Sequence, residues 1–174
     1  PGIDAGTTAG YIRRVQRANG EIPWSDGNMT DPWDHVESAM GLDVAGNRAG
    51  AERAYDWSLQ HQLPDGSWWS EYREGRPVQD AYKDPNMTAY IAVGVLHHFL
   101  IYRDEAFLLW MWRCLQRAMN FVIGLQQPEG QISWALRADG SISARALLTG
   151  SSSMYMSLCC AEKIALVLGE KPAA

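Results

Sequence analysis

A short charged and aromatic stretch, residues 31–37, contains the side chains of this sequence best suited to acid–base chemistry. It reads Asp-Pro-Trp-Asp-His-Val-Glu. A carboxylate followed by proline favours the start of a helix, with Asp31 as the N-cap. The positive end of the helix dipole explains Asp34 as well. Neither effect requires His35 or Glu37, so these two residues call for another explanation.

General acid catalysis is the chemistry that these residues would support. A carboxyl group beside the indole of Trp33, in a partly dry cavity, would have a raised pKa and could donate a proton. We predict Glu37 as this acid, because it lies one helical turn beyond the cap. Asp34 is predicted as a second catalytic carboxyl group. His35 could shuttle the proton or orient a carboxylate. The structural alternative is that Asp34 only complements the dipole and Trp33 only packs.

Two later segments start in the same way, and equivalent positions offer side chains for a ligand. Helix starts are predicted at Asp31, Asp84 and Thr149. Residues two and six positions after each start lie on one helical face. These residues are aromatic or polar, and they are Trp33 and Glu37, Asn86 and Tyr90, and Ser151 and Tyr155. We expect them to converge on one cavity that binds a small-molecule substrate.

The elements that position these residues are organised by three copies of one turn. Each copy has a glutamine, a glycine four residues later and then a tryptophan, at residues 16–24, 62–68 and 126–134. The glycine permits the left-handed conformation that ends a helix. We expect each glutamine amide to bond last-turn carbonyls. Trp24, Trp68 and Trp134 are expected to pack on their own helix pairs, which is a structural role.

The repeated turns predict an all-α chain of three antiparallel helix pairs. Each pair has an amphipathic outer helix and a more apolar inner helix, within repeats of about 4–45, 46–103 and 104–169. The sequence shows no domain boundary, so residues 1–174 are interpreted as one domain. An Arg-Ala pair recurs at the same offset in the second and third outer helices. Residues 69–83 are expected to form a polar loop.

The pattern of glutamine, a short gap and then Gly-x-Trp resembles the Gln-Trp repeat of squalene-hopene cyclases. The alternation of outer and inner helices is similar to that of protein prenyltransferases and six-hairpin glycoside hydrolases. Residues 31–37 with 148–152 resemble bacterial proteins described as prenyltransferase-like or squalene-cyclase-like. The resemblance implies an α/α-toroid with a central cavity. Complete toroids have more helix pairs than three, so it also implies a missing remainder of a longer chain or a homodimer that completes the ring.

The main functional hypothesis is a prenyltransferase-like or terpenoid-cyclase-like enzyme that acts on an isoprenoid-like substrate by general acid catalysis. One alternative is a six-hairpin glycosidase-like protein, in which Asp34 or Glu37 would face Asp84 across a sugar. The other is a non-catalytic toroid that binds a ligand or scaffolds an assembly. The Asp-x-Asp-Asp pattern of polyene cyclases is absent from the sequence. No ligand spacing for zinc occurs either, so neither a metal nor a cofactor is expected.

Composition limits the remaining classes. Hydrophobic residues make up 47% of the 174 residues and charged ones 20%, which is typical of a folded globular chain. The formal charge of −5 argues against a nucleic-acid binder. No apolar run reaches the length of a transmembrane helix. Three cysteines, two of them adjacent, favour a reducing, cytoplasmic location. Eight Trp and seven Tyr against three Phe suit a surface that stacks on sugar or isoprenoid.

Overall fold

A computed structural model describes residues 5–170 and confirms the all-α class. Its helices are α1 (Ala5–Val15), α2 (Pro32–Val44), α3 (Arg48–His61), α4 (Pro85–Ala89), α5 (Ile91–Tyr102), α6 (Glu105–Gly124) and α7 (Leu148–Val167). The loop after α3 also contains a small antiparallel hairpin that the sequence did not indicate, formed by β1 (Tyr72–Arg73) and β2 (Arg76–Pro77).

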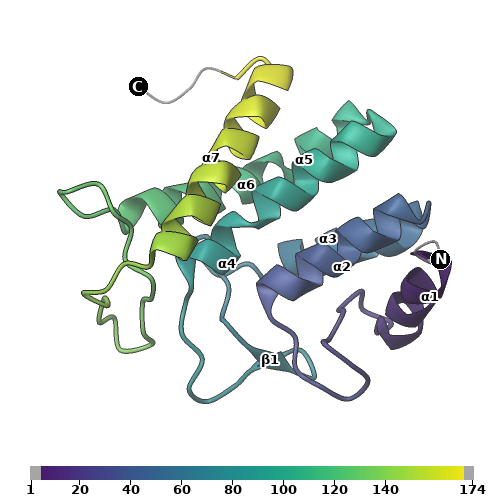
Figure 1. The fold of residues 1–174 in the computed structure, drawn as a ribbon, viewed down its shortest axis with the longest axis horizontal. Coiled ribbons are helices and arrows are strands. Elements are labelled where there is room, and N and C mark those ends of the chain that lie inside the picture. The colour runs from purple at the N-terminus through teal and green to yellow at the C-terminus, as the bar shows by residue number, and fades with distance from the viewer. Residues whose placement is uncertain (1–4, 171–174) are drawn as a thin grey trace.

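The helices form an inner and an outer row (Figure 1). Helix α2 contacts α5, and α5 in turn contacts α7, so these three form the inner row. Helix α3 packs on α2, and α6 packs on α4 and α5, which makes both of them outer helices. The core between the rows is closed by fully buried side chains, among them Leu42, Tyr55, Trp57, Leu108 and Met111. The predicted alternation of outer and inner helices is therefore confirmed.

Two of the three predicted helix starts are correct. The Asp31 carboxylate accepts hydrogen bonds from the backbone N–H groups at the start of α2, and Asp84 does the same for α4. The third prediction is wrong. Helix α7 begins at Leu148, and its N-cap is Leu147, whose side chain makes no capping bond. Ser151 therefore lies four residues after its cap instead of two, which removes the expected equivalence with the other two helices.

The glutamine of each repeated turn closes that turn instead of bonding the helix end. Its Nε2 donates to the carbonyl of the turn glycine, from Gln16 to Gly20 (3.1 Å), Gln62 to Gly66 (3.0 Å) and Gln126 to Gly130 (2.9 Å). In the first two copies the same Nε2 also donates, over 2.9 Å in each case, to a carbonyl of the following outer helix, Gly50 or Cys114. The glutamine thus links neighbouring helix pairs.

The three tryptophans of the turns differ in burial. Trp68 is 2% exposed, and its indole N–H donates to the Ser58 carbonyl over 2.8 Å, which confirms its structural role. Trp134 is half-buried and meets Tyr82 edge-on at 5.3 Å between ring centroids. Trp24 is 53% exposed, so it does not pack into its helix pair as predicted, although its indole N–H donates to the Asp31 carboxylate at the start of α2. Trp68 follows its glycine two residues sooner than the others, and this spacing directs its ring onto α3.

Candidate functional site

Three loops meet at the end of the molecule where the inner helices begin. The loop before α2 pairs with the β-hairpin through two backbone bonds between Thr30 and Tyr72, of 2.9 and 2.8 Å. The loop before α4 pairs with the loop before α7 through two bonds between Lys83 and Leu136, of 2.8 and 2.9 Å. These bridges fix the starts of the inner helices relative to one another.

An aromatic pair lies between α2 and the junction of α4 with α5. The rings of Trp33 and Tyr90 stack with their centroids 3.8 Å apart and their planes 14° apart. The Tyr90 hydroxyl donates to Oε1 of Glu37 over 3.1 Å. Burial, followed by the charge and the hydrogen bond of Glu37, raises the pKa of Tyr90 to about 12. The structure thus brings together three residues that the repeat pattern placed on one surface.

Asp34 has the perturbed carboxyl group of this region. Its pKa is raised to about 6, first by burial, then by the charge of Asp31 and a hydrogen bond with it, and last by the charge of Glu37. Asp34 and Glu37 both line a groove of about 400 Å³ between α1 and α2, which Trp24 also borders. A carboxyl group that remains partly protonated near neutral pH is suited to proton donation. Asp34 meets this criterion.

His35 has a structural role, contrary to the proton-shuttle hypothesis. The side chain is 1% exposed and both ring nitrogens are engaged. Nδ1 accepts from the Ile22 backbone N–H over 3.1 Å, and Nε2 lies 2.9 Å from the Ala54 carbonyl, to which it donates. Burial lowers the pKa of His35 to about 4, so the ring is neutral at ordinary pH. These two bonds connect α2 to the first repeated turn and to α3, so neither nitrogen is available to a substrate.

The remaining predicted residues lie away from the groove of Asp34. Asn86 is half-buried, and its Oδ1 has no hydrogen-bond partner within residues 5–170. Ser151 is half-buried on α7, which contacts α4. Tyr155 is 70% exposed and has Cys159 as its neighbour, which raises the pKa of the phenol. Neither these three residues nor Trp33 and Tyr90 line the groove of Asp34, so the predicted residues do not all share one cavity.

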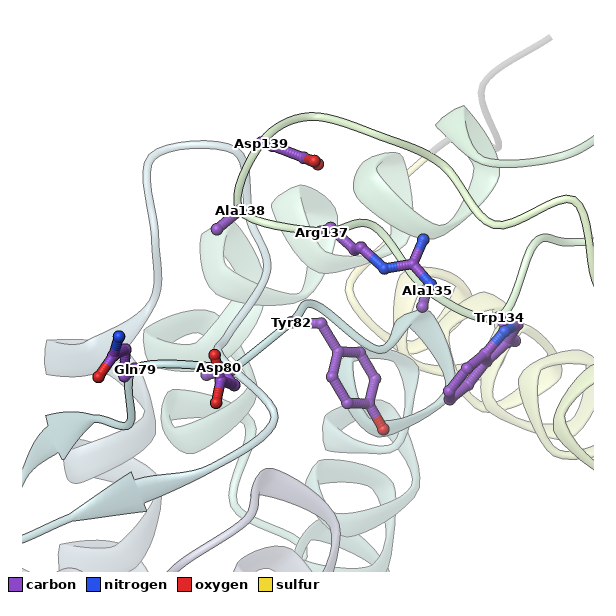
Figure 2. A pocket seen from close by; sticks show the side chains of 9 residues that line it. Gln79, Asp80, Tyr82, Trp134, Ala135, Arg137, Ala138 and Asp139 are labelled. Carbon is purple, nitrogen blue, oxygen red and sulfur yellow. The ribbon is translucent and has the colours of Figure 1, made fainter.

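A second pocket of about 400 Å³ was not predicted from the sequence. It lies between the loops before α4 and α7, with Tyr82 beside Trp134 at one end and Gln79 and Asp80 at the other (Figure 2). Burial, then the charges of Asp84 and Asp31, raise the pKa of Tyr82. Its hydroxyl is therefore close to the helix starts. The sequence signal was Trp134, which the repeat pattern assigned to packing alone.

The described residues contain neither a metal-binding cluster nor a membrane-spanning helix. No group of three His, Cys, Asp or Glu side chains between residues 5 and 170 is arranged to hold a metal ion. In the same part of the chain, no helix combines the length and the apolar character that crossing a membrane requires.

Sequence comparison relates the chain to a carbohydrate enzyme. It is 47% identical over 163 residues to the MMP endo-(1,4)-3-O-methyl-α-D-mannosidase of Mycolicibacterium hassiacum. The alignment covers 94% of this chain and 45% of that enzyme, so the chain spans less than half the length of this relative. No family model matches the chain.

Structural comparison establishes the fold. An endoglucanase from Komagataeibacter sucrofermentans superposes with a TM-score of 0.62 at 17% identity, over 95% of this chain and 55% of that one. Cellobiose 2-epimerase from Bacillus thermoamylovorans also gives 0.62, at 19% identity, over 93% and 47%. The chain has the α/α-toroid type of fold. The comparisons support the toroid part of the sequence resemblance and do not support its prenyltransferase or squalene-cyclase part.

Proposed function

We propose that this chain forms part of a glycoside hydrolase that cleaves α-linked mannose polymers internally, including polymers of 1,4-linked, 3-O-methylated mannose. The observation that carries the proposal is the groove between α1 and α2, in which the carboxyl groups of Asp34 and Glu37 lie with the exposed indole of Trp24. Glu37 also accepts a hydrogen bond from Tyr90, which stacks on Trp33. The mannosidase relative supports this choice of substrate. Aromatic faces bind the apolar faces of sugar rings, and a methyl ether on the sugar extends that apolar surface.

The proposed reaction needs one proton donor and one carboxylate. Asp34, with a pKa of about 6, donates its proton to the glycosidic oxygen while the bond from this oxygen to the anomeric carbon breaks. Water adds to the anomeric carbon, and a carboxylate takes the proton that the water loses. Glu37 is our choice for this second group, because it borders the same groove and the Tyr90 hydroxyl fixes its orientation.

Asp84, which the sequence offered as the opposing carboxylate, is less suitable. It is buried, and its Oδ1 accepts from the backbone N–H groups of Asn86 and Met87. Burial raises its pKa, but these two capping hydrogen bonds hold the carboxylate at the start of α4. An isoprenoid substrate, the main hypothesis from the sequence, has less support than a sugar, because the relatives in both comparisons act on carbohydrate by name.

The test uses 1,4-linked α-mannose oligomers, with and without 3-O-methyl groups, and the protein as its host produces it. We expect new reducing ends from internal cleavage. Asp34→Asn should lower kcat on the oligomers by about 10²–10⁴-fold, the usual contribution of a general acid. On an aryl mannoside, whose phenol leaves without protonation, the kcat of Asp34→Asn should fall much less. The exposed Asp26 provides a matched control, and Asp26→Asn should be neutral.

Three outcomes would contradict the proposal. Oligomer binding without any cleavage would indicate a binding toroid instead of an enzyme. Equal losses on both substrates in Asp34→Asn would remove Asp34 from the role of acid. If Glu37→Gln retained full kcat, the second carboxylate would have to be another residue.

A further inference from the structure

Each of the first two repeated turns makes the same close contact with the next outer helix. At Gly20, an added Cβ would lie 2.1 Å from the backbone oxygen of Arg53 in α3. At Gly66, it would lie 2.2 Å from the backbone oxygen of Arg117 in α6. Only glycine permits this approach, because any side chain would overlap the helix backbone. The turn glycines are therefore docking positions as well as helix stops.

The two docked helices share a sequence pattern at the contact. The turn glutamine bonds the carbonyl of a small residue, Gly50 in α3 or Cys114 in α6. An arginine follows three residues later and returns a bond to the turn. Arg53 donates to Oε1 of Gln16 over 2.8 Å, and Arg117 donates to the Leu63 carbonyl. The next residue is in both cases a fully buried alanine, so the shared pattern is small-x-x-Arg-Ala.

The third turn has the same donor and the same glycine but no helix against them. Gln126 Nε2 donates to the carbonyl of Gly130, and within residues 5–170 it has no second carbonyl of the kind that Gln16 and Gln62 reach. A Cβ at Gly130 would meet no atom within 4 Å. Both residues are exposed, whereas Gly20 and Gly66 are buried.

An apolar groove between α6 and α7 extends to Ile123, three residues before Gln126. Its volume is about 540 Å³, and it is lined by Trp112, Leu115, Met119, Ile123, Leu158, Ala161 and Ala165 together with polar residues of α6 and Glu162 of α7. Ile123 is 51% exposed, and near the end of α7 Leu166 is 63% exposed. An uncovered patch of this kind marks a contact surface.

We propose that the third turn and this groove bind a further outer helix carrying the pattern small-x-x-Arg-Ala, supplied by a longer polypeptide. The argument is the internal symmetry, since α3 and α6 occupy the equivalent place at the first two turns. The solved toroids and the mannosidase relative are about twice as long as the aligned chain, so they have room for such a helix. A second copy of this chain fits less well, because its α1 has Thr7 where α3 has Arg53 and α6 has Arg117.

The test supplies the helix directly. A copy of the α3 sequence, residues 48–62, is joined to the C-terminus of the chain through a flexible glycine–serine linker long enough to reach the groove. Tethering gives an effective concentration near the millimolar range, so even a weak contact becomes measurable. We expect the melting temperature to rise by at least about 3 °C, because binding to the native state stabilises it. Arg→Ala at the position of Arg53 in the appended copy should remove most of this rise.

The host chain provides the matched control. Gly130→Ala should abolish the rise, because its Cβ would enter the helix backbone. Gly140→Ala should retain the rise, since Gly140 also has a positive φ, 83° against 99°, and equally open surroundings, but lies in a different turn. For each host variant, the melting temperature with the appended helix is compared with that of the same variant without it. The strain caused by the substitution then cancels from the difference.

Any of three results would overturn the proposal. One is the absence of a rise with the appended helix, and another is an equal rise in the Gly130→Ala and Gly140→Ala hosts. The third is self-association of the unextended chain in sedimentation that Gly130→Ala abolishes, because a second copy would then occupy the groove. This inference is independent of the proposed hydrolysis, and loss of one leaves the other intact.

Discussion

Two neighbouring residues in the first turn of α2 are both held in their neutral forms, but they differ in accessibility. Asp34 is partly buried and borders a groove beside other carboxyl groups, so its neutral form is favoured. His35 is enclosed by α3 and the first turn, so its neutral form is favoured as well, but by burial between two backbone groups. Only the first arrangement leaves a proton accessible to substrate. Residue type and spacing alone do not distinguish the two cases.

The pKa of His35 predicts a loss of stability in acid. The folded value of about 4 lies below the ordinary 6.5, so the unfolded chain binds a proton between these values that the folded chain does not. Above pH 6.5 the free energy of unfolding is therefore not reduced by His35, and it decreases as the pH falls toward 4. Between pH 7 and 4.5 we expect this residue to cost about 2–3 kcal/mol of unfolding free energy. Denaturant titrations at the two pH values measure it.

The comparison variant is His35→Gln, which is less stable at pH 7 but should lose correspondingly less stability on acidification. Equal pH dependence in the wild type and His35→Gln would contradict the assignment.

At the scale of elements, the turn after each outer helix determines how the next pair attaches. The same glutamine and glycine recur in all three copies, yet the tryptophan that follows is buried in one, half-buried in another and exposed in the third. The glutamine and glycine that recur in the turns make contacts with backbone groups, and these contacts do not depend on which side chains lie nearby. The tryptophan instead follows the space that the neighbouring loop leaves.

Trp68 and Trp24 should therefore differ in their effect on stability. Trp68→Ala should cost about 3–5 kcal/mol, since it creates a cavity and leaves the Ser58 carbonyl without its partner. Trp24→Ala should cost about 1 kcal/mol, from the loss of its bond to Asp31. Denaturant titration of the two variants tests the difference, and similar losses would show that the turn tryptophans share one role.

The turn glycines provide a second test at this scale. Gly66→Ala combines a strained φ of 94° with a Cβ 2.2 Å from the Arg117 oxygen, so we expect a loss above about 3 kcal/mol or failure to fold. Gly140→Ala has the strained φ alone and should cost about 1 kcal/mol. Thermal unfolding compares them. Equal losses would mean that the approach of α6 to this turn tolerates a side chain.

At the scale of the whole molecule, the chain is an arc of a ring with two different edges. One edge is the groove between α1 and α2, which contains the carboxyl groups of the proposed acid and base. The other is the apolar groove between α6 and α7 beside the third turn. The central part is closed by a buried polar contact, in which His98 Nδ1 lies 2.9 Å from Oδ1 of Asp43 between α5 and α2. This contact gives His98 a structural role.

The sequence by itself determined the helix pairs, the repeated turns and two of the three inner-helix starts. These features depend on local chemistry, namely the N-cap carboxylates of Asp31 and Asp84 and the glycines that permit a left-handed stop. It also brought Trp33, Glu37 and Tyr90 together, because helical periodicity places them on facing surfaces. The start of α7 was misplaced, since Leu147 provides no capping side chain to detect.

Only the tertiary structure decided which titratable groups are available for chemistry. Burial between α2, α3 and the first repeated turn made His35 structural, and partial burial together with the charges of Asp31 and Glu37 gave Asp34 its raised pKa. It also decided that Trp24 is exposed and that Tyr82 and Trp134 share a pocket. Desolvation depends on segments far apart in the chain, whereas the charges that act on Asp34 belong to near neighbours in the sequence. The neighbours of a residue in space therefore distinguish a catalytic acid from a structural residue. The order of residues in the sequence alone does not specify these neighbours.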